Sequence, residues 1–180
     1  MNSGPVRRRL RAFLHRPQQT VGWPAALRAG IGGGVAIGLL LALARLSGQP
    51  WLMAPFGASC VLLFSLPASP LSQPANVIGG HLLSTAIGLA VAQWLPDAVW
   101  AMPLAAMLAI AAMAGLRVTH PPAGADPLLV LLARPDWSFL LFPVALGSLA
   151  LVAVAWCVHR VPGGVRYPLP PPRPEPTRTS

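Results

Sequence analysis

Four long apolar stretches constrain this chain more than any other feature. They cover residues 25–46, 77–95, 100–116 and 139–158, and a helix of about 20 apolar residues is enough to cross the hydrocarbon core of a bilayer. Only 9% of the residues are charged, against roughly 25% in an average soluble domain. Because backbone groups that face lipid must be paired within their own segment, each stretch is expected to be a helix. The sequence therefore predicts an all-α polytopic membrane protein.

An internal repeat divides the apolar region. Pro55-Phe56-Gly57-Ala58 and Pro122-Ala123-Gly124-Ala125 share the pattern P-x-G-A at an offset of 67 residues, and each opens a short apolar run between two long stretches. Paired short segments interrupted by glycine or proline mark transport sites in membrane proteins, because broken helices direct their ends at a solute. We therefore expect two repeats, each made of helix, short segment and helix.

The short segments decide the topology. We expect half-helices over residues 54–66 and 121–133, the second of which is too short to cross a bilayer as a helix. As re-entrant elements they leave about four transmembrane helices in two parallel repeats. If both segments crossed instead, the chain would have six spans and two inverted three-span repeats. The length of the second segment favours the re-entrant arrangement.

Charge indicates the orientation. All thirteen basic residues are arginine, and most lie before the first span or after the last. Short basic flanks stay on the cytoplasmic side, so both termini are expected in the cytoplasm of a bacterial inner-membrane protein. The first apolar run is too long for a cleaved signal and is interpreted as a retained helix. Nucleic-acid binding is disfavoured, because no aromatic-rich basic module accompanies the arginines.

The chain divides into three parts. Residues 1–22 form a basic tail that we expect to be mobile, residues 23–160 form the transmembrane domain, and residues 161–180 form a Pro- and Arg-rich tail that we expect to be disordered or polyproline-like. Cys60 and Cys157 lack metal-site spacing and are expected to be small buried hydrophobes.

Small residues recur at helical spacing in the first span. Gly30, Gly34 and Gly38 stand four residues apart, a spacing that lets helix backbones approach closely in lipid. The partner helix could belong to the same chain or to a second copy. With so few spans per chain, a homo-oligomer is expected.

Polar residues inside the apolar domain are the candidates for function, since such residues are costly at membrane depth. His81 opens the second span shortly after Asn76, and Ser84, Thr85 and Gly88 share its helix face. This stripe should face the bundle interior. The alternative is a histidine that only hydrogen-bonds a neighbouring backbone carbonyl.

The second candidate group surrounds the glycine-proline turns. Prolines suit the first turn of a helix, and the N–H groups of a half-helix start, with its positive dipole end, favour an anion. Two such starts meeting near mid-membrane would form an anion site. Together with the polar stripe, the expected substrate-binding residues are Pro55, Phe56, Gly57, Ala58, Ser59, Asn76, His81, His120, Pro121, Pro122, Gly124 and Ala125. Arg117 is interpreted as an interfacial anchor.

Asp126 complicates the anion site, because a carboxylate repels an anionic solute. It could cap the half-helix, pair with Arg117 or His120, or carry a proton, and we take His81, His120 and Asp126 as candidates for a proton relay. The same three side chains could hold a divalent metal, although their scattered positions favour no metal. No catalytic motif or cofactor-binding pattern is present, so neither enzymatic activity nor a cofactor is predicted.

At these residues the chain resembles the HPP family of small integral membrane proteins, named for the motif that stands here as His120-Pro121-Pro122. The likeness also covers Ala54–Ser59 and Gln73–His81, and extends over residues 25–160. The resemblance implies a four-helix membrane protein, and some members are linked to nitrite transport.

We therefore predict a transporter or channel for a small inorganic anion, with nitrite (or nitrate) as the best candidate. Its partners would be the lipid bilayer, the anion and further copies of the chain. The alternatives are an accessory or structural membrane protein that moves nothing, and a metal-ion channel.

Overall fold

All regular elements in the described part of the chain are helical, which confirms the predicted class. The computed structural model describes residues 5–18, 20–95 and 99–170. By length and composition, three helical segments of these residues can cross a membrane: Trp23–Ser47, Pro74–Trp94 and Trp137–His159. The helices are α1 (Pro5–Leu14), α2 (Trp23–Ser47), α3 (Pro55–Ser65), α4 (Pro74–Trp94), α5 (Ala101–Gly115), α6 (Asp126–Ala133) and α7 (Leu146–His159).

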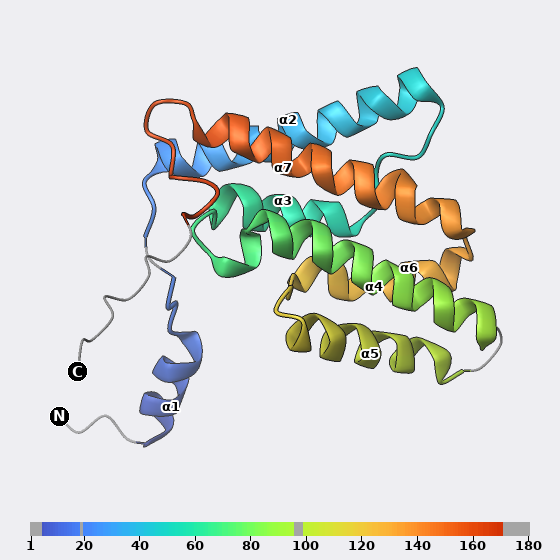
Figure 1. Ribbon diagram of the computed structural model, residues 1–180. Helices are drawn as coiled ribbons and strands as arrows, with labels where there is room; N and C mark the ends of the chain where they lie inside the picture. Colours follow the sequence, from blue (N-terminus) through green and yellow to red (C-terminus); the bar gives the residue numbers. More distant parts are fainter. Residues whose placement is uncertain (1–4, 19, 96–98, 171–180) are drawn as a thin grey trace, which may run out of the picture.

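Helices α2 to α7 form one bundle in which each helix runs opposite to the one before it (Figure 1). α3 runs along α7, since Phe56 faces Gly147 and Leu63 accepts a hydrogen bond from His159 near the other end. In the same way, α6 runs along α4. The expectation that α3 and α6 are re-entrant half-helices in two parallel repeats is therefore wrong. The triplets α2–α3–α4 and α5–α6–α7 are inverted relative to each other, as in the six-span alternative.

Irregular backbone lengthens the two short helical segments. Residues 48–54, which precede α3, are not helical, and extended backbone rises about 3.3 Å per residue against about 1.5 Å in a helix. Within this segment, the Trp51 ring packs edge-on against Phe142 at 5.2 Å. A 3-10 turn at Pro121–Ala125 likewise lengthens α6. Helix length alone therefore misled the topology prediction.

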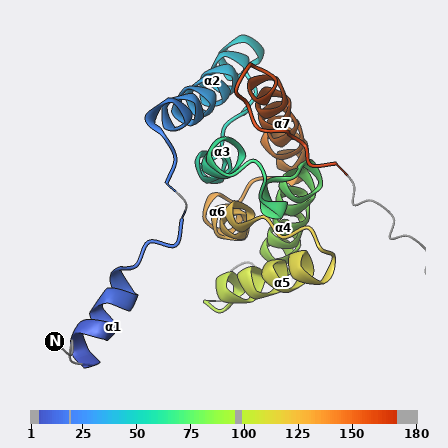
Figure 2. The ribbon, with the colours of Figure 1, turned by 90° about the vertical axis from the view of Figure 1, so that its left-hand side faces the viewer.

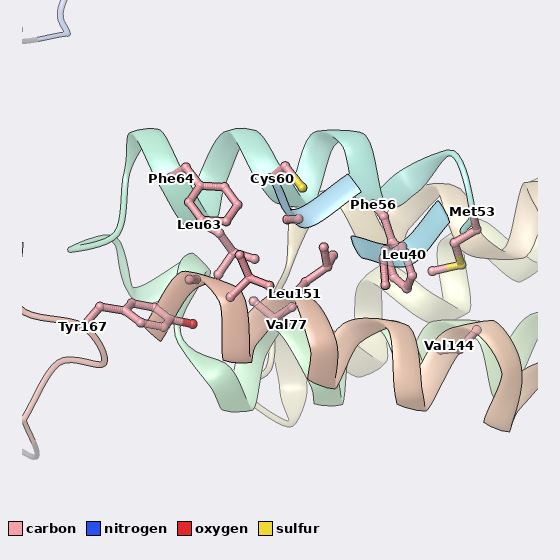
Figure 3. Packing of buried hydrophobic residues seen from close by; sticks show 13 residues of the cluster. Leu40, Met53, Phe56, Cys60, Leu63, Phe64, Val77, Val144, Leu151 and Tyr167 are labelled. Atoms are coloured by element: carbon pink, nitrogen blue, oxygen red, sulfur yellow. The ribbon is translucent and has the colours of Figure 1, made fainter. Parts of the chain in front are cut away.

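The main apolar core lies between α2, α3, α4 and α7 (Figure 3). Leu40, Phe56, Leu63, Val77 and Leu151 are fully buried in it. A smaller cluster joins α4, α5 and α6. Viewed along the bundle, α3 and α6 lie between α2 and α5 (Figure 2). This arrangement places the two short helices beside each other; one P-x-G-A motif opens α3, and the other lies in the 3-10 turn before α6.

The C-terminal segment is partly ordered, which corrects the expected disorder of that tail. Tyr167 is buried and donates a hydrogen bond to the Ser72 carbonyl at 3.1 Å, and burial raises the pKa of its hydroxyl. The Leu169 N–H donates to Gln73 Oε1 at 2.8 Å. These two bonds hold residues 161–170 on the bundle, and residues 171–180 lie outside the described part.

The N-terminal basic segment contains a helix, α1, that stands apart from the bundle (Figures 1 and 2). No helix was predicted in this tail from the sequence. Residues 1–4 and 19 lie outside the described part of the chain. A further correction concerns the cysteines: Cys60 is buried as expected, but Cys157 is exposed.

The glycines of α2 have two different environments. A Cβ on Gly32 would lie 2.5 Å from the Phe64 ring, so this glycine permits close packing within the chain. By contrast, a Cβ on Gly30, Gly34 or Gly38 would meet no atom within 4 Å. The predicted stripe therefore makes no close helix contact within the chain.

Close contact between α4 and α6 is expected to be sensitive to one methyl group. A Cβ on Gly88 would lie 2.9 Å from Pro127 Cα, so Gly88→Ala should destabilise the fold by about 1–3 kcal/mol through overpacking. In the control Gly38→Ala the new methyl group meets nothing and stability should be unchanged or slightly higher. Thermal unfolding in detergent micelles measures both, and equal midpoints would contradict this packing.

Candidate functional site

A polar stripe on α4 faces the interior of the bundle, as the sequence predicted. His81, Ser84 and Thr85 are all fully buried. Ser84 donates a hydrogen bond to the Ala123 carbonyl at 2.6 Å. In the first turn of the same helix, the Asn76 side chain donates to the Thr119 carbonyl at 2.9 Å. These two bonds fix the turn that contains His120 against α4.

His81 lies between two side chains that occupy equivalent positions in the repeats. Its Nε2 is 2.8 Å from Ser59 Oγ on α3, and its Nδ1 is 2.8 Å from Asp126 Oδ2 on α6. Ser59 and Asp126 are 67 residues apart, the same offset as the two P-x-G-A motifs that they follow. Both side chains are fully buried. The two short helices therefore meet at one imidazole.

His120 extends this cluster from the other side of the serine. Its Nε2 is 2.9 Å from Ser59 Oγ, and its Nδ1 is 2.8 Å from the Leu71 carbonyl oxygen. The rings of His81 and His120 pack edge to face with centroids 5.0 Å apart. The result is one continuous chain of hydrogen bonds, Leu71–His120–Ser59–His81–Asp126, which we call the histidine network.

Proton counting defines the state of the histidine network. The Leu71 carbonyl only accepts, so His120 Nδ1 carries a proton, and a neutral His120 must then accept the Ser59 hydroxyl proton at Nε2. Ser59 has no second proton for His81, so His81 Nε2 must donate to it. His81 Nδ1 and Asp126 then share one more proton, either as a neutral pair or as an ion pair. Satisfying all four bonds therefore takes one proton more than two neutral histidines and an ionised aspartate supply.

The extra proton has more than one place to reside. If the Ser59 hydroxyl turns from His120 to His81, the same number of protons fits with His120 as the cation and Asp126 as the anion. Each link is 2.8–2.9 Å long, a normal hydrogen-bond distance. The arrangement can thus hold one proton and pass it between Asp126 and His120 through Ser59 and His81.

The hydrogen-bond partners of Asp126 differ from those that the sequence suggested. Its partners are His81 and Thr85, whose hydroxyl donates to Oδ2 at 3.2 Å; pairing with Arg117 or His120 is not observed, and Arg117 is exposed at the end of α5. Asp126 Oδ1 is buried with no hydrogen-bond partner among the described residues. Within those residues, no group of three His, Cys, Asp or Glu side chains is placed to hold a metal ion.

Several predicted site residues lie on an apolar groove instead of the histidine network. The groove runs between α3 and α6 and has a volume of about 910 Å³. The predicted residues that line it are Pro55, Ala58, Pro121, Pro122 and Ala125.

The remaining predicted residues separate further. Phe56 packs edge-on against His81 at 5.1 Å. Gly57 lines a second cavity beside α2, and a Cβ on Gly124 would meet no atom within 4 Å. The P-x-G-A segments therefore supply the walls of grooves, and the residue that follows each of them enters the histidine network.

The backbone N–H groups at the starts of the short helices are already used. The N–H groups of Phe56 and Gly57 donate to Met53 and Ala54 at 3.0 and 3.1 Å, and that of Ala123 donates to His120 at 3.0 Å. In addition, α3 and α6 lie side by side and antiparallel (Figure 1). The two helix starts do not meet end to end as expected, and side chains provide the polar groups at the centre.

Comparison with known proteins identifies the family. The transmembrane region that defines the HPP family matches residues 18–168, which include all members of the histidine network. The chain belongs to the HPP transmembrane family. Two transmembrane proteins of Dictyostelium discoideum are similar to this HPP protein. Each is 35% identical to it over 66% of the length of the present chain. The chain matches 41% and 44% of the lengths of these relatives. No solved structure matches it.

The family motif gains a physical meaning from this geometry. The histidine of His120-Pro121-Pro122 belongs to the histidine network, and the prolines line the groove. Sequence reasoning did not find the Leu71 carbonyl, because a backbone acceptor leaves no residue signature. It also missed the pairing of Ser59 with Asp126 across His81, although aligning the repeats at 67 residues places them together.

Removing the buried carboxylate of Asp126 should lower the stability of the fold far more than removing a carboxylate from the surface. Asp126→Ala leaves His81 Nδ1 and the Thr85 hydroxyl without their buried partner, which should cost about 3–5 kcal/mol. The control Asp136→Ala removes an exposed carboxylate that caps a short turn through Ser138 at 2.8 Å and should lower the stability much less. Thermal unfolding of the two variants in the same detergent makes the comparison. A smaller loss for Asp126→Ala would contradict the assigned network.

Proposed function

We propose that this HPP protein moves a small inorganic anion across the membrane together with a proton, with nitrite as the first candidate and nitrate as the second. The observation that carries the proposal is the histidine network, because ionisable groups fully buried in a membrane bundle are costly and default to a functional role. The network stores one proton among two histidines and an aspartate, the side chains that form proton relays in membrane transport proteins.

The chemistry of Asp126 favours a protonated solute. A buried carboxylate repels an anion, but its unpartnered Oδ1 accepts a hydrogen bond from an acid O–H. Nitrite becomes such an acid by taking up one proton, which the histidine network holds. A proton-coupled mechanism therefore reconciles an anionic substrate with an aspartate at the centre.

One observation favours a second function, that of an accessory membrane protein. The side chains of Ser59, His81, His120 and Asp126 are fully buried, and the α3–α6 groove has none of them in its lining. In that case the histidine network would serve only to fix the fold. Transport requires α3 to move relative to the His120 turn, so that the groove opens onto the network.

We also propose that the protein is a homo-oligomer in a bacterial inner membrane, with both termini in the cytoplasm. The α3–α6 groove is apolar, and Val61 and Leu132 on its walls are 61% and 76% exposed. A second copy would bury these side chains. The ends of α2 and α7 nearest the termini lie at the same end of the bundle (Figure 1), in agreement with the arginine-rich flanks.

Uptake into proteoliposomes tests transport. The purified protein should take up nitrite with saturation, with nitrate as a competitor, and acidification inside the vesicle should accompany uptake. His81→Gln and His120→Gln interrupt the histidine network and should reduce uptake by about a hundredfold, the lower range expected for loss of a proton-transfer group.

The control is His15→Gln, which changes an exposed histidine outside the bundle and should transport normally. Normal uptake by both network variants between pH 5 and 8 would exclude proton coupling through the histidines. Absence of any anion flux from folded, inserted protein would support the accessory function instead.

A further inference from the structure

A second cavity lies between α2 and α3, on the far side of α3 from the histidine network. It has a volume of about 740 Å³, and its walls are mostly apolar. Gly30 and Gly34 of α2 and Gly57 of α3 line it, and a Cβ on any of the three would meet no atom within 4 Å. The cavity therefore exists because these three positions lack side chains, and we call it the α2–α3 channel.

Two nitrogen-bearing side chains line the end of this channel nearest the termini. His159, at the end of α7, is 9% exposed; its Nε2 donates to the Leu63 carbonyl at 2.8 Å, and its Nδ1 is buried with no partner among the described residues. Arg28, in the first turns of α2, also lines the channel. Its Nη1 lies 2.9 Å from the position of a Cβ on Gly163, which places it beside the turn that follows His159.

The charge at this end selects an anion. No acidic residue is among those that line the channel. Arg160, the neighbour of His159, stacks on the Trp156 ring at 3.5 Å. A guanidinium forms paired hydrogen bonds to phosphate, and the lone pair of an imidazole Nδ1 accepts a hydrogen bond from a headgroup hydroxyl. The chain's own N-terminal helix is a poor occupant, because Arg7, Arg8, Arg9 and Arg11 would face Arg28.

The length of the channel selects a lipid over a free anion. Its lining on α2 begins at Ala25 and ends at Ile37, and the part from Arg28 inward is about 14 Å of helix at about 1.5 Å per residue. Half of a hydrocarbon core of about 30 Å is about 15 Å. An apolar channel of this length, with basic groups at its outer end, matches one acyl chain attached to an anionic headgroup in a single leaflet.

We propose that the α2–α3 channel is a binding site for an anionic phospholipid. The phosphate binds Arg28, a headgroup hydroxyl donates to the free Nδ1 of His159, and one acyl chain lies over the glycines of α2 and α3. The lipid comes from the leaflet that faces both termini. This site is independent of the proposed transport function, since none of its contacts involves the histidine network.

Competition between lipids tests the site on the full-length purified protein. After detergent delipidation, the protein is mixed with equal amounts of phosphatidylglycerol and phosphatidylcholine, and bound lipid is counted by native mass spectrometry. One phosphatidylglycerol per chain should be retained, with a preference of about tenfold, as expected for hydrogen bonds to charged groups. Equal retention of the two lipids would overturn the proposal.

Matched variants locate the bound lipid. Gly34→Leu fills the channel, whereas Gly38→Leu adds the same side chain to an equally open position outside it. Only Gly34→Leu should lose the lipid. Arg28→Gln should abolish the preference for phosphatidylglycerol, and Arg45→Gln, at the other end of α2, should keep it. Thermal unfolding of all four variants verifies folding, and Arg28→Gln remains decisive should Gly34→Leu unfold.

Two further experiments distinguish a bound lipid from a bound free anion. His159→Gln retains a donor toward Leu63 but lacks the free ring nitrogen, and should weaken lipid retention without unfolding the protein. Inorganic phosphate should not displace the lipid. Displacement by phosphate alone, or retention by Gly34→Leu equal to that by Gly38→Leu, would show an anion site without an acyl chain and would refute the lipid assignment.

Discussion

The structure depends on one constraint: polar groups inside an apolar bundle must satisfy one another. His81 has two ring nitrogens, and the bundle brings a partner to each from a different short helix. Because unsatisfied polar groups in a low-dielectric interior are expensive, these bonds fix the positions of α3 and α6 more firmly than apolar packing alone. Glycines at the contacts of α4 with Pro127 and His120 allow the backbones to come close enough.

Much of this arrangement was accessible from the sequence. The apolar stretches predicted the helical membrane class, and the spacing of Ser84 and Thr85 after His81 predicted an inward polar face. The P-x-G-A repeat located α3 and α6 correctly. What failed was the direction of those helices, because the length of the second suggested that it could not cross, whereas extended backbone before α3 and a 3-10 turn before α6 lengthen both segments.

The site was harder to predict than the fold. Ser59, His81, His120 and Asp126 were all recognised, but their connections were not, since the partner of each depends on how the two repeats pack. The expected role of backbone N–H groups was wrong because the turns before Phe56, Gly57 and Ala123 bind those groups locally. Tyr167 gave no periodic signal and yet orders the segment after α7.

The repeat has a consequence for how the centre came to hold charge. Ser59 and Asp126 occupy the same place in the two repeats, and each hydrogen-bonds one nitrogen of the same imidazole. Serine at both places would leave the centre without an acidic group, and aspartate at both would set two like charges against one ring, where they repel. The difference at this single pair makes the repeated scaffold electrically polar, with an acidic end and a carbonyl end.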